Sequence, residues 1–237
     1  ELISFVQDLY PKYGYNEVLT PQLFRADLFK TSGHYDKFHD DMYWFEGSDV
    51  GEELGVKAMN CPGHCHLFST GKRSYRELPV RWAEFSRLHR NERSGTLNGI
   101  TRVRSFAQDD AHIYCEPDQV AQEIDSFFKM TAEIYDKLGV EGIEMAVSTR
   151  PDEFLGEPED WDVAEKALID AVERAGFKCN FLYLLGEFNR GEGWLRNRTR
   201  AAGGDHFFDV IALVIIGRTW QWHQNRWTSG AGQFGHR

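Results

Sequence analysis

Apolar positions follow two different spacings along this chain, and the spacing predicts the order of the elements. Apolar residues recur every three or four positions in stretches that predict helices, at residues 2–10, 26–31, 65–70, 117–138 and 161–172. Short β-branched or aromatic runs predict strands at residues 17–20, 43–45, 56–58, 143–147 and 177–185. Pro11 is expected to end the first helix, and Gly139 and Gly176 the last two. The sequence therefore predicts an α+β fold, with an antiparallel sheet flanked by helices.

The longest strand pattern is a pair of segments, residues 81–92 and 102–112, joined by a loop with two glycines. The simplest structure is a long antiparallel hairpin. Among the charged residues of its strands would be Arg90, Glu92, Arg102 and Arg104. Charged groups on a sheet that buries one face are costly unless they meet a ligand. Arginine matches phosphate oxygens two at a time, and a carboxylate suits the exocyclic amine of a base, so the pattern predicts a nucleotide site.

Composition narrows the class of protein. A chain of 237 residues can bury one sizeable core, and no apolar run approaches the ~20 residues that span a bilayer. The net charge of −10 argues against unspecific binding of polyanions. Four cysteines are too few for a disulfide scaffold, so we expect a reducing, cytoplasmic location. Because no apolar run is long enough to span a bilayer, we expect no membrane partner. The absence of an initiator Met favours a fragment.

Two further motifs make the pattern specific: Met59-Asn60-Cys61-Pro62-Gly63-His64 and Gln108-Asp109-Asp110-Ala111-His112. With the hairpin, they resemble the catalytic domain of threonyl-tRNA synthetases, which are class II aminoacyl-tRNA synthetases. The resemblance covers residues 1–187 and implies a class II core with motifs 1 and 2. It also implies ATP-dependent activation of threonine to threonyl-adenylate and transfer to tRNA(Thr). Residues 188–237 are expected to be a divergent continuation of the same domain.

The resemblance implies a zinc site for threonine. Cys61 and His112 would be ligands, and both residue types suit zinc; the third ligand is expected outside this chain. An apolar pocket separates isosteres such as threonine and valine by only about 10²-fold, whereas zinc can accept the threonine hydroxyl and amine. By resemblance Asp110 accepts the hydroxyl hydrogen, and Met59 and Gln108 line the pocket.

For ATP, the resemblance assigns Arg90 to the α-phosphate and Arg102 to the terminal phosphates, both as catalytic groups. Glu92 would bind the adenine amine and Phe106 the adenine face. Mg²⁺ would accompany ATP. The region around Pro21 resembles the first class II motif, which implies a homodimer interface.

Several residues also have plainer interpretations. Cys61 and His112, taken singly, are typical of buried structural residues. His64 and His66 favour helix packing or capping over metal binding. Arg102 and Arg104 could instead form ion pairs with Glu84 and Glu92 on an exposed face.

The end of the chain departs from the family pattern. Residues 188–204 lack the tyrosine and lysine of the family's substrate-contacting stretch, and residues 222–237 match nothing in it. Suitable codons for residues 225–229, read out of register, would restore a family-like strand, which suggests frame errors. The chain ends before the third class II motif, so we expect negligible aminoacylation from these 237 residues alone. The alternative is a degenerate synthetase-like protein that binds ligands without aminoacylating.

Overall fold

The computed structural model describes residues 1–99, 102–140, 144–148, 150, 158–175, 179–182, 195–201, 204–209 and 212–216. The chain divides into two compact units. The first unit holds residues 1–16, 74–81 and 111–223, and the second unit holds residues 17–73, 82–110 and 224–237. Short 3-10 turns lie at His39–Asp41, Tyr75–Glu77, Ser94–Thr96 and Pro117–Gln119.

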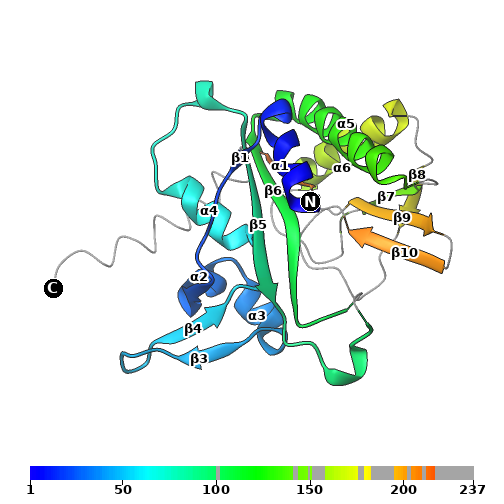
Figure 1. Ribbon diagram of the computed structural model, residues 1–237. Helices are drawn as coiled ribbons and strands as arrows, with labels where there is room; N and C mark the ends of the chain where they lie inside the picture. Colours follow the sequence, from blue (N-terminus) through cyan, green and yellow to red (C-terminus); the bar gives the residue numbers. More distant parts are fainter. Residues whose placement is uncertain are drawn as a thin grey trace. The chain divides into compact units, whose positions relative to one another are not determined.

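The first unit contains the long helices (Figure 1). These are α1 (Leu2–Tyr13), α5 (Val120–Leu138) and α6 (Pro158–Arg174). Helix α5 contacts both α1 and α6. A four-stranded sheet in this unit has the order β10-β9-β7-β8. Its strands are β7 (Glu144–Ser148), β8 (Cys179–Leu182), β9 (Leu195–Ala201) and β10 (Gly204–Asp209).

The second unit contains a small antiparallel sheet of order β2-β4-β3, with α2 against it (Figure 1). The elements are β2 (Leu23–Arg25), α2 (Ala26–Thr31), α3 (His34–Phe38), β3 (Trp44–Glu46), β4 (Glu53–Val56) and α4 (Cys61–Ser69). Phe29, Met42 and Ala58 form its core. The Phe29 and Trp44 rings meet edge to face at 5.5 Å, so aromatic packing holds this sheet together.

A third sheet has the order β1-β5-β6-β11. Its strands are β1 (Asn16–Glu17), β5 (Val80–His89), β6 (Ser105–Cys115) and β11 (Ala212–Ile216). Strand β11 runs parallel to β6, and β7 runs parallel to β8. The predicted α+β fold with sheets flanked by helices is therefore confirmed, although these two sheets contain parallel strand pairs and, among the described strands, only the β2-β4-β3 sheet is purely antiparallel.

The hairpin strands do not extend as far toward the loop as the sequence predicted: β5 ends at His89 and β6 begins at Ser105, so Arg90, Glu92, Arg102 and Arg104 lie outside them. The Arg90 amide still donates to the Arg104 carbonyl at 2.9 Å, but the next amide, that of Asn91, donates to the Asp41 carbonyl at 2.8 Å. The chain therefore leaves the ladder at this point because another segment satisfies its backbone.

Two predicted element ends were also wrong. Pro11 lies inside α1, which ends instead at Gly14 with φ 75°, where the Gly14 and Tyr15 amides bond to carbonyls of the last turn. The strand predicted at 17–20 is only the two residues of β1, because the Thr20 amide donates to the Glu84 side chain rather than to a strand.

Helix α4 begins at Cys61, before the predicted residue 65. The predicted strands at 143–147 and 177–185 fall partly outside the described residues. Gly176, residues 188–194 and residues 222–237, which include the proposed frame errors, lie outside them entirely. Within the described ranges, no helix is long and apolar enough to cross a membrane.

Candidate functional site

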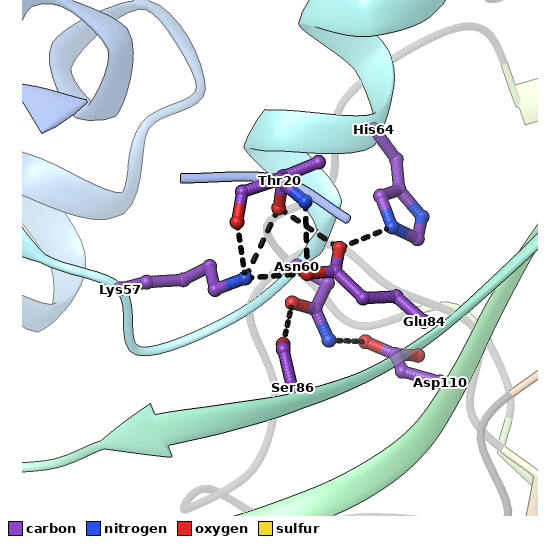
Figure 2. A network of polar contacts seen from close by, with 7 residues as sticks. All are labelled: Thr20, Lys57, Asn60, His64, Glu84, Ser86 and Asp110. Carbon is purple, nitrogen blue, oxygen red and sulfur yellow. Dashed lines mark hydrogen bonds and ion pairs between the residues drawn. The ribbon is translucent and has the colours of Figure 1, made fainter. Parts of the chain in front are cut away.

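One face of β5 in the second unit carries both apolar and polar side chains. Trp82, Glu84, Ser86 and Leu88 alternate along the strand and are all at most 8 % exposed. Trp82 and Leu88 suit a core, but Glu84 and Ser86 need hydrogen-bond partners because unpaired polar groups are costly when buried. One partner of each, His64 for Glu84 and Asn60 for Ser86, comes from the turn and helix that hold the Met59–His64 motif (Figure 2).

Glu84 is the centre of a buried ion pair. Its Oε1 lies 2.7 Å from Lys57 Nζ, and its Oε2 lies 2.8 Å from His64 Nε2. Thr20 donates its amide at 3.0 Å and its hydroxyl at 2.8 Å. Burial raises the pKa of the Glu84 carboxyl, but the hydrogen bonds from His64, Lys57 and Thr20 outweigh burial and lower the pKa to about 2. Glu84 is therefore an ionised anchor for α4.

A second branch of the network joins Ser86, Asn60 and Asp110 (Figure 2). The Ser86 hydroxyl donates to Asn60 Oδ1 at 2.8 Å, and Asn60 Nδ2 donates to Asp110 Oδ2 at 3.1 Å. Asn60 immediately precedes α4, and Asp110 lies on β6. The branch therefore holds the start of α4 beside the strand that carries the expected threonine-binding residues.

The expected threonine-pocket residues of the second unit lie on β6 and at the start of α4. Gln108 and Asp110 are two apart on β6 and share a face, and Asp110 is buried. Met59 and Cys61 flank Asn60, whose side chain bonds Asp110. Met59 Sδ lies 3.2 Å from His34 Nε2, and burial lowers the pKa of His34 to about 4, so this imidazole is neutral at pH 7.

The expected ATP residues make contacts where β5 ends and β6 begins. The Arg90 guanidinium lies 5.0 Å from the centre of the Phe106 ring, over its face. Arg102 Nε lies 3.0 Å from Glu92 Oε2, and Arg104 Nε donates to the Glu92 carbonyl at 3.0 Å. The sequence left two interpretations of Arg102 open, phosphate binding and an ion pair. The contact with Glu92 is the ion pair.

Glu84 pairs with Lys57 rather than with either arginine, so an exposed arginine ladder through Glu84 was the wrong alternative. The His64 side chain is buried and bonds Glu84, which agrees with the prediction of a helix-packing role for this residue. His66 lies on the same helix but is exposed.

The two expected zinc ligands belong to different units. Cys61 is the first residue of α4 in the second unit, and His112 is a buried residue of β6 in the first. A thiol and an imidazole are the donors that zinc prefers, so the residue types fit this metal. Over the described part of the chain, no cluster of three or more His, Cys, Asp or Glu residues is placed to hold a metal ion.

Sequence reasoning missed Asn60, Ser86, Lys57 and Thr20. A usable signal was the spacing of polar residues: Asn60 and His64 are four apart at the start of a helix, and Glu84 and Ser86 are two apart on a strand. Four helical residues rise ~6 Å and two strand residues ~6.7 Å, so the two pairs can meet side by side.

Comparison with known proteins gives consistent matches along the chain. Residues 43–223 match the model of the tRNA synthetase class II core domain (G, H, P, S and T). The threonine–tRNA ligase of Bdellovibrio bacteriovorus is 44% identical over 220 residues, which cover 93% of this chain and 31% of that protein. The cytoplasmic threonine–tRNA ligase of Saccharomyces cerevisiae is 44% identical over 223 residues, covering 94% of this chain and 28% of that protein.

Solved structures agree with the sequence matches. A crystal structure described as the RNA binding domain of threonyl-tRNA synthetase from Cryptosporidium parvum has a TM-score of 0.78 and 40% identity, covering 87% of this chain and 50% of that one. A putative threonyl-tRNA synthetase from Aeropyrum pernix has a TM-score of 0.75 and 30% identity, covering 86% and 47%. The chain spans about a third of the length of the curated relatives it matches.

Proposed function

Because the chain belongs to the class II tRNA synthetase core domain family, we propose that it is part of the catalytic domain of a threonine–tRNA ligase. The family and fold that the motifs indicated are confirmed. The observation that carries the proposal is the alignment of nine-tenths of the chain with proteins named threonine–tRNA ligase. The reaction would be ATP-dependent formation of threonyl-adenylate, followed by transfer of threonine to tRNA(Thr).

ATP would bind where β5 ends and β6 begins. Phe106 would contact the adenine face and Glu92 the adenine amine, while Arg90 would contact the α-phosphate and Arg102 the terminal phosphates. Arg90 would stabilise the charge that develops as the threonine carboxylate attacks. The nearness of Arg102 to Glu92, at 3.0 Å, supports the grouping of these two side chains. The charge of the pyrophosphate would be offset by Mg²⁺ bound with ATP.

Threonine would bind beside the start of α4. Asp110 would accept the hydrogen of the threonine hydroxyl, with Met59 and Gln108 lining the pocket. Cys61 and His112 would hold zinc, which when bound would supply a Lewis acid for the amine and hydroxyl of threonine. The buried position of Asp110 supports its role, because a hydroxyl acceptor discriminates best where water is excluded.

A homodimer would form through the region around Pro21. Leu19 and Leu23 support this part of the proposal, because they are large apolar residues that are 81% and 49% exposed on either side of Pro21. Residues 1–187 would form the core with motifs 1 and 2, and residues 188–237 would continue the same domain. The family match extends to residue 223, which supports a single domain up to that point.

The test is amino-acid-dependent exchange of pyrophosphate into ATP, measured on the protein expressed from its complete natural coding sequence. Exchange should depend on threonine and should exceed exchange with valine by far more than the ~10² that an apolar pocket provides. Binding of ATP and threonine without exchange would instead indicate a degenerate synthetase-like protein. Equal exchange with valine and threonine would contradict the proposed specificity.

A further inference from the structure

We propose that Asn60 is a positioning residue for threonine recognition, because it fixes the direction of the Asp110 carboxylate, and that Ser86 in turn fixes Asn60. The proposal rests on the proposed function, in which Asp110 accepts the hydroxyl hydrogen of threonine. None of the three side chains is more than 5 % exposed, so solvent does not compete for their hydrogen bonds.

The chemistry of the partners determines the orientation of the Asn60 amide. An ionised carboxylate only accepts hydrogen bonds, so the group that faces Asp110 Oδ2 at 3.1 Å must be the NH₂. The amide oxygen then faces Ser86, whose hydroxyl donates to it at 2.8 Å. A flipped amide would put the Asn60 oxygen against the Asp110 carboxylate, two acceptors face to face, so Asp110 selects the orientation of Asn60. The Ser86 hydroxyl then holds the amide in place by donating to its oxygen.

A parallel contact prevents the Asn60 turn from sliding along β5. His64 follows Asn60 by one turn of α4, and its Nε2 lies 2.8 Å from Glu84 Oε2, while Asn60 bonds Ser86 (Figure 2). Asn60 and His64 therefore tie the same stretch of chain to two adjacent inward positions of β5, Ser86 and Glu84. The stretch includes Cys61, so the same contacts fix the position of this expected zinc ligand along β5.

The consequence is a prepared acceptor for the substrate. A carboxylate that already receives one hydrogen bond is restrained in rotation, so its lone pairs point in one direction before threonine binds. Loss of a hydrogen bond to a charged group corresponds to about 10- to 100-fold in affinity. The loss should act on hydroxyl recognition and not on ATP, because the expected ATP residues bond to other partners.

The decisive variant is Asn60→Ala, measured in threonine-dependent pyrophosphate exchange by the full-length protein. We expect the threonine KM to rise about 10- to 100-fold, the ATP KM to stay unchanged, and the preference for threonine over valine to fall. Ser86→Ala keeps the Asn60 amide and should cause a smaller change of the same kind. Tyr13→Phe is the control: it removes the hydrogen bond from the Tyr13 hydroxyl to Glu133 in the first unit, so it should lower the melting temperature and leave the threonine preference unchanged.

A crystal structure of the Asn60→Ala protein gives a readout that does not depend on activity. We expect the Asp110 carboxylate to be rotated from its wild-type direction. An unmoved carboxylate, or an unchanged threonine KM in folded Asn60→Ala protein, would overturn the inference. If Asn60→Ala does not fold, an unchanged threonine preference in Ser86→Ala overturns it. Absence of exchange in the wild-type protein would overturn the proposed function instead, and the crystal structure would still decide whether Asn60 orients Asp110.

Discussion

Glu84 lies between Lys57, His64 and Thr20 without any exposure to solvent, on a strand face that also buries Trp82, Ser86 and Leu88. Such an ion pair contributes little net stability, because each charge gives up its hydration, but breaking it leaves an uncompensated charge. Its value here is geometric. It fixes α4, and with it the turn that bears Cys61, against β5.

Glu84 should make the stability of the protein depend on acid. Its folded pKa, about 2, lies below the ordinary value, so the stabilisation is complete above that ordinary value and is lost as the pH falls toward 2. We expect the free energy of unfolding to fall by about 3 kcal/mol from this group between pH 5 and pH 2. Urea unfolding followed by circular dichroism at a series of pH values measures it.

Glu84→Gln is the informative variant. At pH 7 it should lose about 3–5 kcal/mol, because Lys57 stays buried without its counter-charge, and its stability should depend less steeply on pH below 5. The exposed Asp8→Asn variant is the control and should keep the wild-type slope. An equal slope in wild type and Glu84→Gln would refute the assigned role of the carboxylate.

At the scale of elements, helix α1 illustrates how an end is set. Gly14 and Gly139 end α1 and α5, both with positive φ, at 75° and 67°. A side chain in this conformation is strained by ~1 kcal/mol or more. At Gly14 a Cβ would also lie 3.0 Å from Arg81 Nη1, whereas at Gly139 it would meet nothing within 4 Å. Arg81 itself bonds Glu123 of α5 at 2.6 Å.

Gly14→Ala should therefore destabilise the protein more than Gly139→Ala. Both variants carry the backbone strain, about 1 kcal/mol, and only Gly14→Ala disturbs Arg81. Thermal unfolding of the two variants beside wild type gives the comparison. Equal melting temperatures for the two variants would show that Arg81 yields without cost.

The sequence was most informative where local pattern decides structure. Helix α5 was predicted because its buried residues, among them Ile124 and Phe128, recur at helical spacing. The ends of the hairpin strands were not predicted, because the Asn91 amide bonds to Asp41, 50 positions earlier in the chain. No periodicity within the hairpin carries that information.

The candidate site shows the same division. Motif residues such as Cys61 and Asp110 stand out in the sequence because their types suit a ligand. The Asn60–Asp110 bond joins positions 50 apart, and the Lys57–Glu84 pair joins positions 27 apart. Such contacts follow from the packing of α4 against β5, so they became visible only in the folded chain.

At the scale of the whole molecule, the proposed function gives Asp110 the role of a threonine-specific acceptor in a class II synthetase site. Adjacent aspartates on β6 offer a matched pair for testing it. Asp110 is buried and bonds Asn60, whereas Asp109 points to the opposite face of the sheet and is exposed. The two substitutions to asparagine change the charge equally.

The most direct measurement is threonine-dependent pyrophosphate exchange by the full-length protein carrying Asp110→Asn or Asp109→Asn. Asp110→Asn should lose at least about 100-fold in kcat/KM for threonine, because one acceptor oxygen of the buried carboxylate becomes an NH₂ group and the negative charge is lost. Asp109→Asn should remain within a few-fold of wild type. Equal effects of the two substitutions, or full activity of Asp110→Asn, would contradict the claim.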